Sequence, residues 1–194
     1  MYVRDAKNRE EVWLLDRIEE MGLDDTAFRS RDYVVAVDEL SNTKAGFGRV
    51  RIHKVSDGED VCELTSIGVL PEWRRQGVGG HVIERLVEYA GDDGFEEMFA
   101  LTSEGGYLYQ FGFRRIDADE LPPPLVDRLG EKRETIDPDA VPMRLDVERF
   151  ELPDRLREAF KAATEQDEEP EPDASPEEFG IDPETATYKY DTGR

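Results

Sequence analysis

Cysteine is almost absent from this chain, which has one, Cys62, among 194 residues. A single thiol excludes an intramolecular disulfide and a zinc site built on several cysteines, and it is typical of a reducing compartment. Long hydrophobic runs are also missing. None approaches the roughly 20 residues that span a bilayer, and the charged N-terminus does not resemble a signal peptide. We therefore expect a cytoplasmic protein with no metal and no membrane partner.

Lysine is scarce as well, with six lysines and nineteen arginines against 47 acidic residues and a formal net charge of −22. Such a charge repels nucleic acids and anionic membranes, so neither is expected as a partner. Abundant carboxylates with little lysine are typical of acidic proteins that stay soluble in concentrated salt, where charges are screened within a few ångströms. The charge indicates a halophilic cytoplasm rather than a particular substrate.

The order of the predicted elements indicates one mixed α/β domain. Strands are predicted at 2–3, 32–38, 46–55, 61–70, 97–102, 113–117 and 141–147, and helices after a capping box from Asn8 to Glu11 and at 77–90, 107–111 and 125–130. Asp57-Gly58 is a hairpin signal that predicts antiparallel strands on either side. The strand, helix and strand from 61 to 102 predict a right-handed crossover and a parallel pair. The sheet is therefore expected to be mostly antiparallel.

A change of composition near residue 150 predicts a domain at 1–150 and an acidic extension at 151–194. DRLREAFKAA, residues 154–163, predicts a short helix. Residues 165–178 hold eight acids and three prolines, which predicts disorder. The final FGIDPETATYKYDTGR regains aromatic residues, so it is a candidate tail that docks on the domain or on a partner.

Three glycines within four positions, Gly77, Gly79 and Gly80, follow Arg74 and Arg75 in PEWRRQGVGGHVIERLVEYA, residues 71–90. Residues without side chains at a helix start let an anion approach the unpaired N–H groups, and the helix dipole favours that anion. The stretch lacks the Lys-Ser/Thr ending of nucleoside-triphosphate loops and the GxGxxG of dinucleotide sites. It predicts a cradle for the diphosphate of another cofactor.

Arg74-x-x-Gly77-x-Gly79 resembles the Arg/Gln-x-x-Gly-x-Gly/Ala motif of the GCN5-related N-acetyltransferase (GNAT) superfamily. VCELTSIGVLPEWRRQGVGG resembles its fourth strand, loop and third helix start, and YQFGF its later helix ending in aromatic-Gly-Phe. GFRRIDADELPPPL with VPMRLDV is similar to amino-acid N-acetyltransferases of the N-acetylglutamate synthase type. The resemblance implies a GNAT acyl-CoA N-acyltransferase fold, with strands four and five splayed apart and acetyl-CoA as co-substrate.

The resemblance also implies the coenzyme site. Its residues are expected to be Val69, Leu70, Arg74, Arg75, Gln76, Gly77, Val78, Gly79 and Gly80. In the family the loop amides hold the pyrophosphate. Backbone groups near Val69 and Leu70 pair with the pantetheine and can donate to the thioester carbonyl.

The resemblance gives candidates for the two proton transfers. Glu63, six residues before Val69, is expected on the same face of its strand, where the family often has a carboxylate that acts as base directly or through water. A solvated strand glutamate is the alternative. In the family, a tyrosine four residues before the Gly of the Gly-Phe turn acts as the general acid. That position is Leu108 in this chain, with Tyr107 and Tyr109 on either side, and we favour Tyr109 over Tyr107 as the acid. Departure of the thiolate without a general acid is also an open alternative, because the pKa of the coenzyme thiol is near that of cysteine.

The predicted reaction is direct transfer of acetyl from acetyl-CoA to a primary amine, of an amino acid or other small molecule, without an acyl-enzyme. Three alternatives remain: an acyl-CoA sensor without turnover, a protein N-terminal or lysine acetyltransferase, and an interaction protein acting through its acidic tail. The oligomeric state is open, a homodimer included.

Overall fold

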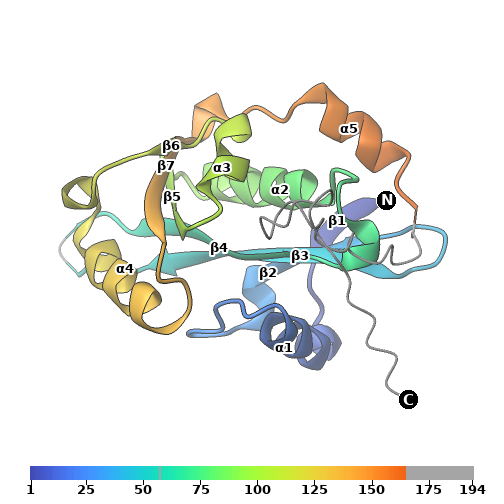
Figure 1. Cartoon of the computed structure of the whole chain (residues 1–194), viewed down its shortest axis with the longest axis horizontal. Coiled ribbons are helices and arrows are strands. Elements are labelled where there is room, and N and C mark those ends of the chain that lie inside the picture. The colour runs from blue at the N-terminus through green and yellow to red at the C-terminus, as the bar shows by residue number, and fades with distance from the viewer. Residues whose placement is uncertain (57, 165–194) are drawn as a thin grey trace, which may run out of the picture.

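The computed structural model describes residues 1–56 and 58–164. Within these residues, seven strands form one sheet in the order β1-β2-β3-β4-β5-β7-β6 (Figure 1). The strands are β1 (Tyr2–Asp5), β2 (Tyr33–Val37), β3 (Lys44–His53), β4 (Val61–Val69), β5 (Glu97–Thr102), β6 (Arg114–Arg115) and β7 (Val141–Asp146). The helices are α1 (Glu11–Glu20), α2 (Val78–Asp92), α3 (Gly105–Leu108), α4 (Pro123–Thr135) and α5 (Asp154–Lys161). Short 3-10 turns include η1 (Asn8–Glu10), η3 (Pro71–Trp73) and η4 (Tyr109–Phe111).

The predicted mixed sheet is confirmed, and its one parallel pair in the described part of the chain is β4 with β5. The two strands pair at Glu63 with Phe99 and at Leu64 with Ala100. Beyond these pairs β4 continues to Val69 and β5 to Thr102 without pairing with each other. The predicted splay of strands four and five is therefore present.

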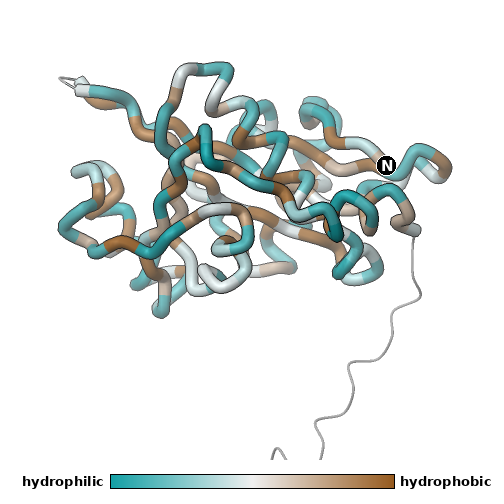
Figure 2. The backbone as a smooth tube through the Cα atoms, turned by 90° about the horizontal axis from the view of Figure 1, so that it is seen from above, coloured by the Kyte–Doolittle hydropathy of each residue, from teal (hydrophilic) through white to brown (hydrophobic). Residues whose placement is uncertain are grey.

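Helices cover both faces of the sheet (Figure 1). The stripe of α2 packs with α3, η4 and α5 over one face, in a cluster that includes Ile83, Leu86, Phe111 and Leu156. On the other face, α1 packs over β2 and β3, and α4 packs over β5. Hydrophobic and hydrophilic residues alternate along the chain, as expected for elements that each bury one side (Figure 2). No helix within the described residues combines the length and apolar character that crossing a membrane requires.

A bulge in β4 determines which side chains reach each face. Arg49 lies opposite Thr65 and Phe47 opposite Gly68, so one residue of β3 faces two of β4. Ser66, with φ of 54°, is one of these two, and its hydroxyl donates to the Asp24 carbonyl at 2.5 Å. An extra residue in a strand reverses, for the residues after it, which side chains point to each face of the sheet. The prediction that Glu63 and Val69 share a face is therefore wrong.

One prediction changes near the N-terminus, and one near residue 154 is confirmed. The capping interaction lies one residue earlier than predicted, because Glu10 accepts the Lys7 N–H at 2.8 Å and η1 precedes α1. The predicted helix near residue 154 is present as α5, and its Leu156 and Phe160 are buried in the same core cluster as α2. The strands around the predicted hairpin are antiparallel. Asp57 of that turn and the acidic stretch and tail at 165–194 lie outside the described residues.

Candidate active site

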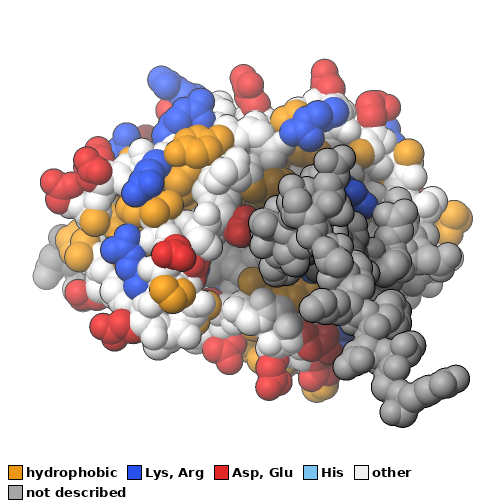
Figure 3. Space-filling model, in the orientation of Figure 1, with side chains coloured by type: hydrophobic (Ala, Val, Ile, Leu, Met, Phe, Trp, Pro, Cys, Tyr) orange, Lys and Arg blue, Asp and Glu red, His pale blue; other side chains and the backbone are white. Residues whose placement is uncertain are grey.

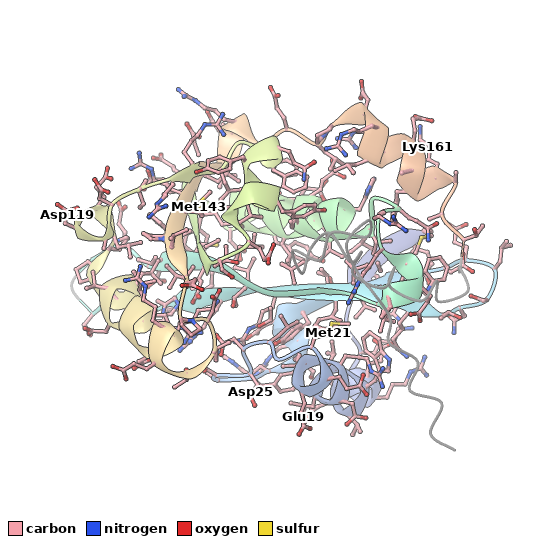
Figure 4. All side chains as sticks on the ribbon, in the orientation of Figure 1. Glu19, Met21, Asp25, Asp119, Met143 and Lys161 are labelled. Carbon is pink, nitrogen blue, oxygen red and sulfur yellow. The ribbon has the colours of Figure 1, made fainter. Side chains whose placement is uncertain are left out.

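A cleft of about 1480 Å³ opens where β4 and β5 separate. One wall is formed by the part of β4 beyond its pairing with β5, by η3 and by the first turn of α2. The facing wall is formed by the end of β5, by α3 and by the last turn of α4, and the segment 21–24 after α1 closes one side. The cleft is the hollow near the centre of the face that Figure 3 shows, and Met21, labelled in Figure 4, lies on its border.

The three glycines of the quoted stretch have three different surroundings. Gly77 precedes α2 with φ of 76°, and a Cβ there would lie 2.2 Å from the Leu156 carbonyl oxygen. Gly79 lines the cleft, where a Cβ would lie 3.1 Å from the Tyr107 hydroxyl. Gly80 faces the core, where a Cβ would lie 2.9 Å from Cδ1 of Leu152. One glycine thus serves the turn, one the cleft and one the packing of the C-terminal segment.

The helix start presents backbone donors to the cleft. The first N–H of α2 with an intrahelical acceptor is that of His81, which donates to the Gly77 carbonyl at 3.1 Å. The preceding N–H groups of Val78, Gly79 and Gly80 therefore have no intrahelical partner. They carry the positive end of the helix dipole, which makes the first turn suited to an anion.

Most residues expected to bind the coenzyme do line the cleft. Those that do are Val69, Leu70, Arg74, Arg75, Gly77, Val78 and Gly79. Gln76 and Gly80 do not. The Gln76 side chain exchanges hydrogen bonds with the Thr164 backbone at 2.8 and 2.9 Å, so it holds the C-terminal segment instead. The sequence could not distinguish a coenzyme-binding role of Gln76 from a structural one, because its partner Thr164 lies 88 residues further along the chain.

Backbone groups at the end of β4 differ from the expectation in one detail. The Leu70 N–H donates to the Ala45 carbonyl at 2.9 Å, so it is already engaged and is not available to a thioester carbonyl. The Val69 carbonyl accepts from Nε of Arg74 at 3.4 Å. Arg75 adopts a left-handed conformation with φ of 62° in the same loop. The arginine loop is thereby anchored to the strand that forms the cleft wall.

The segment after β7 adds residues that the sequence did not predict for this site. Arg155 and Leu156 of α5 line the cleft, and Arg155 donates to the Gln110 side chain. The α5 helix is held on α2 by stacking of Phe160 on His81, with ring centroids 3.8 Å apart, and by Arg157 with Glu84 at 2.6 Å. The packing explains why the Gly77 position tolerates no side chain.

Of the two candidate acids, Tyr107 rather than Tyr109 lies at the cleft. The Tyr107 hydroxyl is next to Gly79, and its ring packs edge-on against Phe111 at 5.2 Å. Partial burial raises the pKa of Tyr107, so its hydroxyl keeps its proton at neutral pH. Tyr109 lies on η4 outside the cleft lining and is 46% exposed. The geometry therefore favours Tyr107 over Tyr109, because two residues along a helix are about half a turn apart around its axis.

Glu63 is fully buried and does not itself line the cleft. Its Oε2 accepts a hydrogen bond from Nε2 of His53 at 2.7 Å and lies 3.7 Å from Nε of Arg128. Its Oε1 has no hydrogen-bond partner among the described residues. The solvated alternative is wrong, since no part of the side chain is exposed. Thr65, on the same side of β4, does line the cleft.

Two basic residues of α4 near Glu63 were missed from the sequence. Arg128 is 4% exposed and pairs with Asp24, and Lys132, one turn later, is 7% exposed and lines the cleft. Their spacing of four residues was the available signal, but a pair of cations on a helix more often faces solvent. Only the packing of α4 against β5 places them under the cleft.

The comparisons with known proteins identify the family. A model of the acetyltransferase (GNAT) family matches residues 2–113, more than half of the chain. The chain belongs to the GNAT acetyltransferase family. It is 29% identical over 62 residues to an uncharacterized N-acetyltransferase of Chlorobaculum tepidum, a match that covers 32% of this chain and 40% of that relative. The aligned part is thus well under two thirds of the relative's length.

Solved structures agree on the fold. N-acetylglutamate synthase from Neisseria gonorrhoeae, complexed with coenzyme A and N-acetyl-glutamate, has a TM-score of 0.60 at 17% identity, over 75% of this chain and 34% of that one. Rv2747 from Mycobacterium tuberculosis, in complex with CoA, has a TM-score of 0.60 at 18% identity, over 75% and 99%. A GNAT-family acetyltransferase from Staphylococcus aureus has a TM-score of 0.55 at 10% identity, over 75% and 98%. The predicted GNAT fold is therefore confirmed.

Proposed function

We propose that this chain is an N-acetyltransferase that moves the acetyl group of acetyl-CoA to the primary amine of an amino acid or another small molecule. The transfer takes place in one step within a ternary complex. One observation carries the proposal: the bare first turn of α2 faces a cleft that opens between two diverging strands, in a chain of the GNAT family.

The proposed coenzyme site is the α2 side of the cleft. The diphosphate of the coenzyme is bound by the first-turn N–H groups around Gly79, with Arg74 and Arg75 supplying positive charge. The side of β4 that faces β5 beyond their last pair, at Val69, is the edge along which the pantetheine arm lies. These assignments are supported by where the residues lie and by the relatives solved with coenzyme A.

Tyr107 is the proposed general acid. Its hydroxyl lies at the cleft beside Gly79, and its raised pKa keeps a proton available for the departing thiolate. The bond that forms joins the acceptor nitrogen to the acetyl carbon, and the bond that breaks joins that carbon to sulfur. The proton from Tyr107 goes to the sulfur, and the Tyr107 oxygen regains a proton from the acceptor nitrogen as the amide forms.

Glu63 is the proposed acceptor of the ammonium proton, through an intervening water. A direct contact with the acceptor is not open to it, since its carboxylate lies below the cleft lining. Arg128 and His53 lie against this carboxylate, at 3.7 Å and through a hydrogen bond of 2.7 Å. The proton binds the carboxylate at Oε1, which has no hydrogen-bond partner among the described residues, and returns to the cleft through the same water.

The proposed acceptor is a small molecule rather than a protein. Support comes from N-acetylglutamate synthase, the similar structure solved with N-acetyl-glutamate, and from Lys132, a cation that lines the cleft. We also propose, from the net charge of −22, that the protein works in a salt-rich cytoplasm, so assays belong in high salt.

The decisive test is thiol release from acetyl-CoA in high salt with a panel of amino acids, polyamines and peptides, alongside coenzyme binding by calorimetry. Cys62 does not interfere, because it is 1% exposed and burial raises the pKa of its thiol to about 12. Turnover with a small amine supports the proposal. Binding without turnover for any amine indicates a sensor, turnover with peptides alone indicates a protein acetyltransferase, and no binding of coenzyme rejects the proposed site.

A further inference from the structure

The last turn of α4 places a buried lysine in the cleft. Lys132 is 7% exposed, and it is the one lysine of the described residues that is more than nine-tenths buried. It lines the cleft together with Ile136 and Asp137, which follow it. Lysine is rarely buried in proteins, and a buried lysine is more unusual still in a chain with six lysines and 47 acidic residues.

Lys132 lacks the partner that a buried ammonium group normally has. Among the described residues, its Nζ has no hydrogen bond and no carboxylate within 4.0 Å. Arg128, one turn earlier, differs, because it is paired with Asp24 and lies 3.7 Å from Glu63. Burial of the ammonium group is costly and lowers the pKa of Lys132, and the charges of Glu63 and Asp137, which raise that pKa, offset the cost only in part because neither carboxylate contacts the ammonium group. An anion from outside the chain would offset this cost.

The coenzyme phosphates are not the anion that the position of Lys132 fits. The first turn of α2 and Arg74 belong to the helical layer on one face of the sheet, whereas α4 belongs to the other. The cleft connects these two sides where β4 and β5 diverge. On the side of α1 and α4, the cleft is lined by Lys132, the segment 21–24 and Thr65.

We propose, on the basis of the acetyl transfer proposed above, that Lys132 binds a carboxylate of the acceptor, which makes the acceptor an amine that also carries a carboxylate. The ammonium group donates to the carboxylate oxygens. The acceptor's amino group then points towards the thioester on the α2 side. Arg128 is a positioning residue: its pair with Asp24 fixes the helix from which Lys132 extends.

The test compares Lys132→Met, Lys132→Arg and, as a control, Lys161→Met, whose side chain is 70% exposed on α5. The probes are the common L-amino acids and their α-amides. Binding is measured by calorimetry with coenzyme A present, and KM is measured where turnover occurs. For the best carboxylate-bearing amine, we expect Lys132→Met to weaken binding by about 10- to 100-fold. Coenzyme affinity and α-amide binding should stay unchanged, Lys132→Arg should retain part of the affinity, and Lys161→Met should match wild type.

The outcomes separate this inference from the proposed function. If amino acids bind but are not acetylated, the carboxylate site stands and the acetyl transfer fails. If carboxylate-free amines are acetylated and amino acids do not bind, the transfer stands and the carboxylate site is rejected. Equal losses for acids and amides in Lys132→Met, weaker coenzyme binding, or acetylation of Lys132 itself would each overturn the inference.

Discussion

The side chains of Glu63 and Val69 lie on opposite faces of the sheet, although both belong to β4. Glu63 faces α4, where it lies 3.7 Å from Arg128. Val69 faces α2, where its Cγ2 would lie 3.4 Å from a Cβ on Gly79. The bulge at Ser66 separates them. One strand therefore contributes both to the α2 side of the cleft, the proposed coenzyme side, and to the α4 side, which holds the buried charges.

The glycines at the start of α2 give the first prediction. Gly79→Val places a branched side chain in the cleft, so coenzyme affinity should fall at least about ten-fold, as measured by calorimetry. Gly80→Ala is the matched control, because its Cβ meets Leu152 and Leu156 rather than the cleft. It should lower the melting temperature and leave the affinity of the folded protein near wild type. Unaltered binding by Gly79→Val would place the phosphates elsewhere.

The two tyrosines give a second prediction. Tyr107→Phe should lower kcat by about 10- to 100-fold, the lower part of the range for general acids, because a thiolate leaves in part unaided. Tyr109→Phe, outside the cleft lining, should change kcat by less than about two-fold. Because the pKa of Tyr107 is raised, wild-type kcat should fall only above about pH 10, and Tyr107→Phe should lack that fall. Equal kcat values for the two variants would remove Tyr107 from the mechanism.

The packing of α5 predicts that the chain divides at residue 164 rather than at 150. A protein of residues 1–164 should keep its melting temperature and its coenzyme affinity. Truncation at 150 removes three buried side chains, Leu152, Leu156 and Phe160, at a cost of roughly 4 kcal/mol or more. The measurements are thermal unfolding and coenzyme binding of both proteins. If the shorter protein is as stable as the longer one, α5 contributes nothing to the core.

The contact of Arg4 with Glu10 predicts a pH dependence of stability. Their bidentate pair, at 2.7 and 2.8 Å, lowers the pKa of Glu10 from 4.5 to about 2. Because the pKa of Glu10 is lower in the folded state than in the unfolded state, the ion pair stabilises the fold fully at pH values above about 4.5. This stability is lost as pH falls from about 4.5 towards 2. Glu10→Gln should cost on the order of 2 kcal/mol at neutral pH and flatten the acid limb of the unfolding free energy.

Glu19→Gln is the control for this measurement, since Glu19 is exposed on the outer side of α1 (Figure 4). It should leave both the unfolding free energy and its acid limb close to wild type. An acid limb that is equally steep in Glu10→Gln would show that other carboxylates carry the dependence.

The fold could be predicted from local patterns because each element carries its own signal. The apolar stripe of α2 and the alternation of β3 and β4 predicted the parallel and antiparallel pairs correctly. What escaped was any feature set by contacts between distant residues. The bulge at Ser66 depends on Asp24, and the surroundings of Gly77 and Gly80 depend on α5.

The candidate site could be predicted only where the backbone defines it. The first turn of α2 was identified from glycine spacing alone, and its place at the cleft agrees with that expectation. The choice between Tyr107 and Tyr109 required the helical phase of a short segment, which two adjacent tyrosines do not reveal. The sequence signal for Lys132, its spacing of four residues from Arg128, was weak, because a lysine beside three other charged residues is typical of a solvated helix.

Mass spectrometry of both acceptor and protein after incubation with acetyl-CoA is the most direct test of the account. The acceptor should be an amine that turns over in the thiol-release panel, and Tyr107→Phe should be run in parallel. One acetyl group is predicted on the acceptor's amino nitrogen and none on the protein, with product formed more slowly by the variant. Acetyl groups on the protein instead of the acceptor, or acetyl-CoA left intact with every amine, would contradict direct transfer within this cleft.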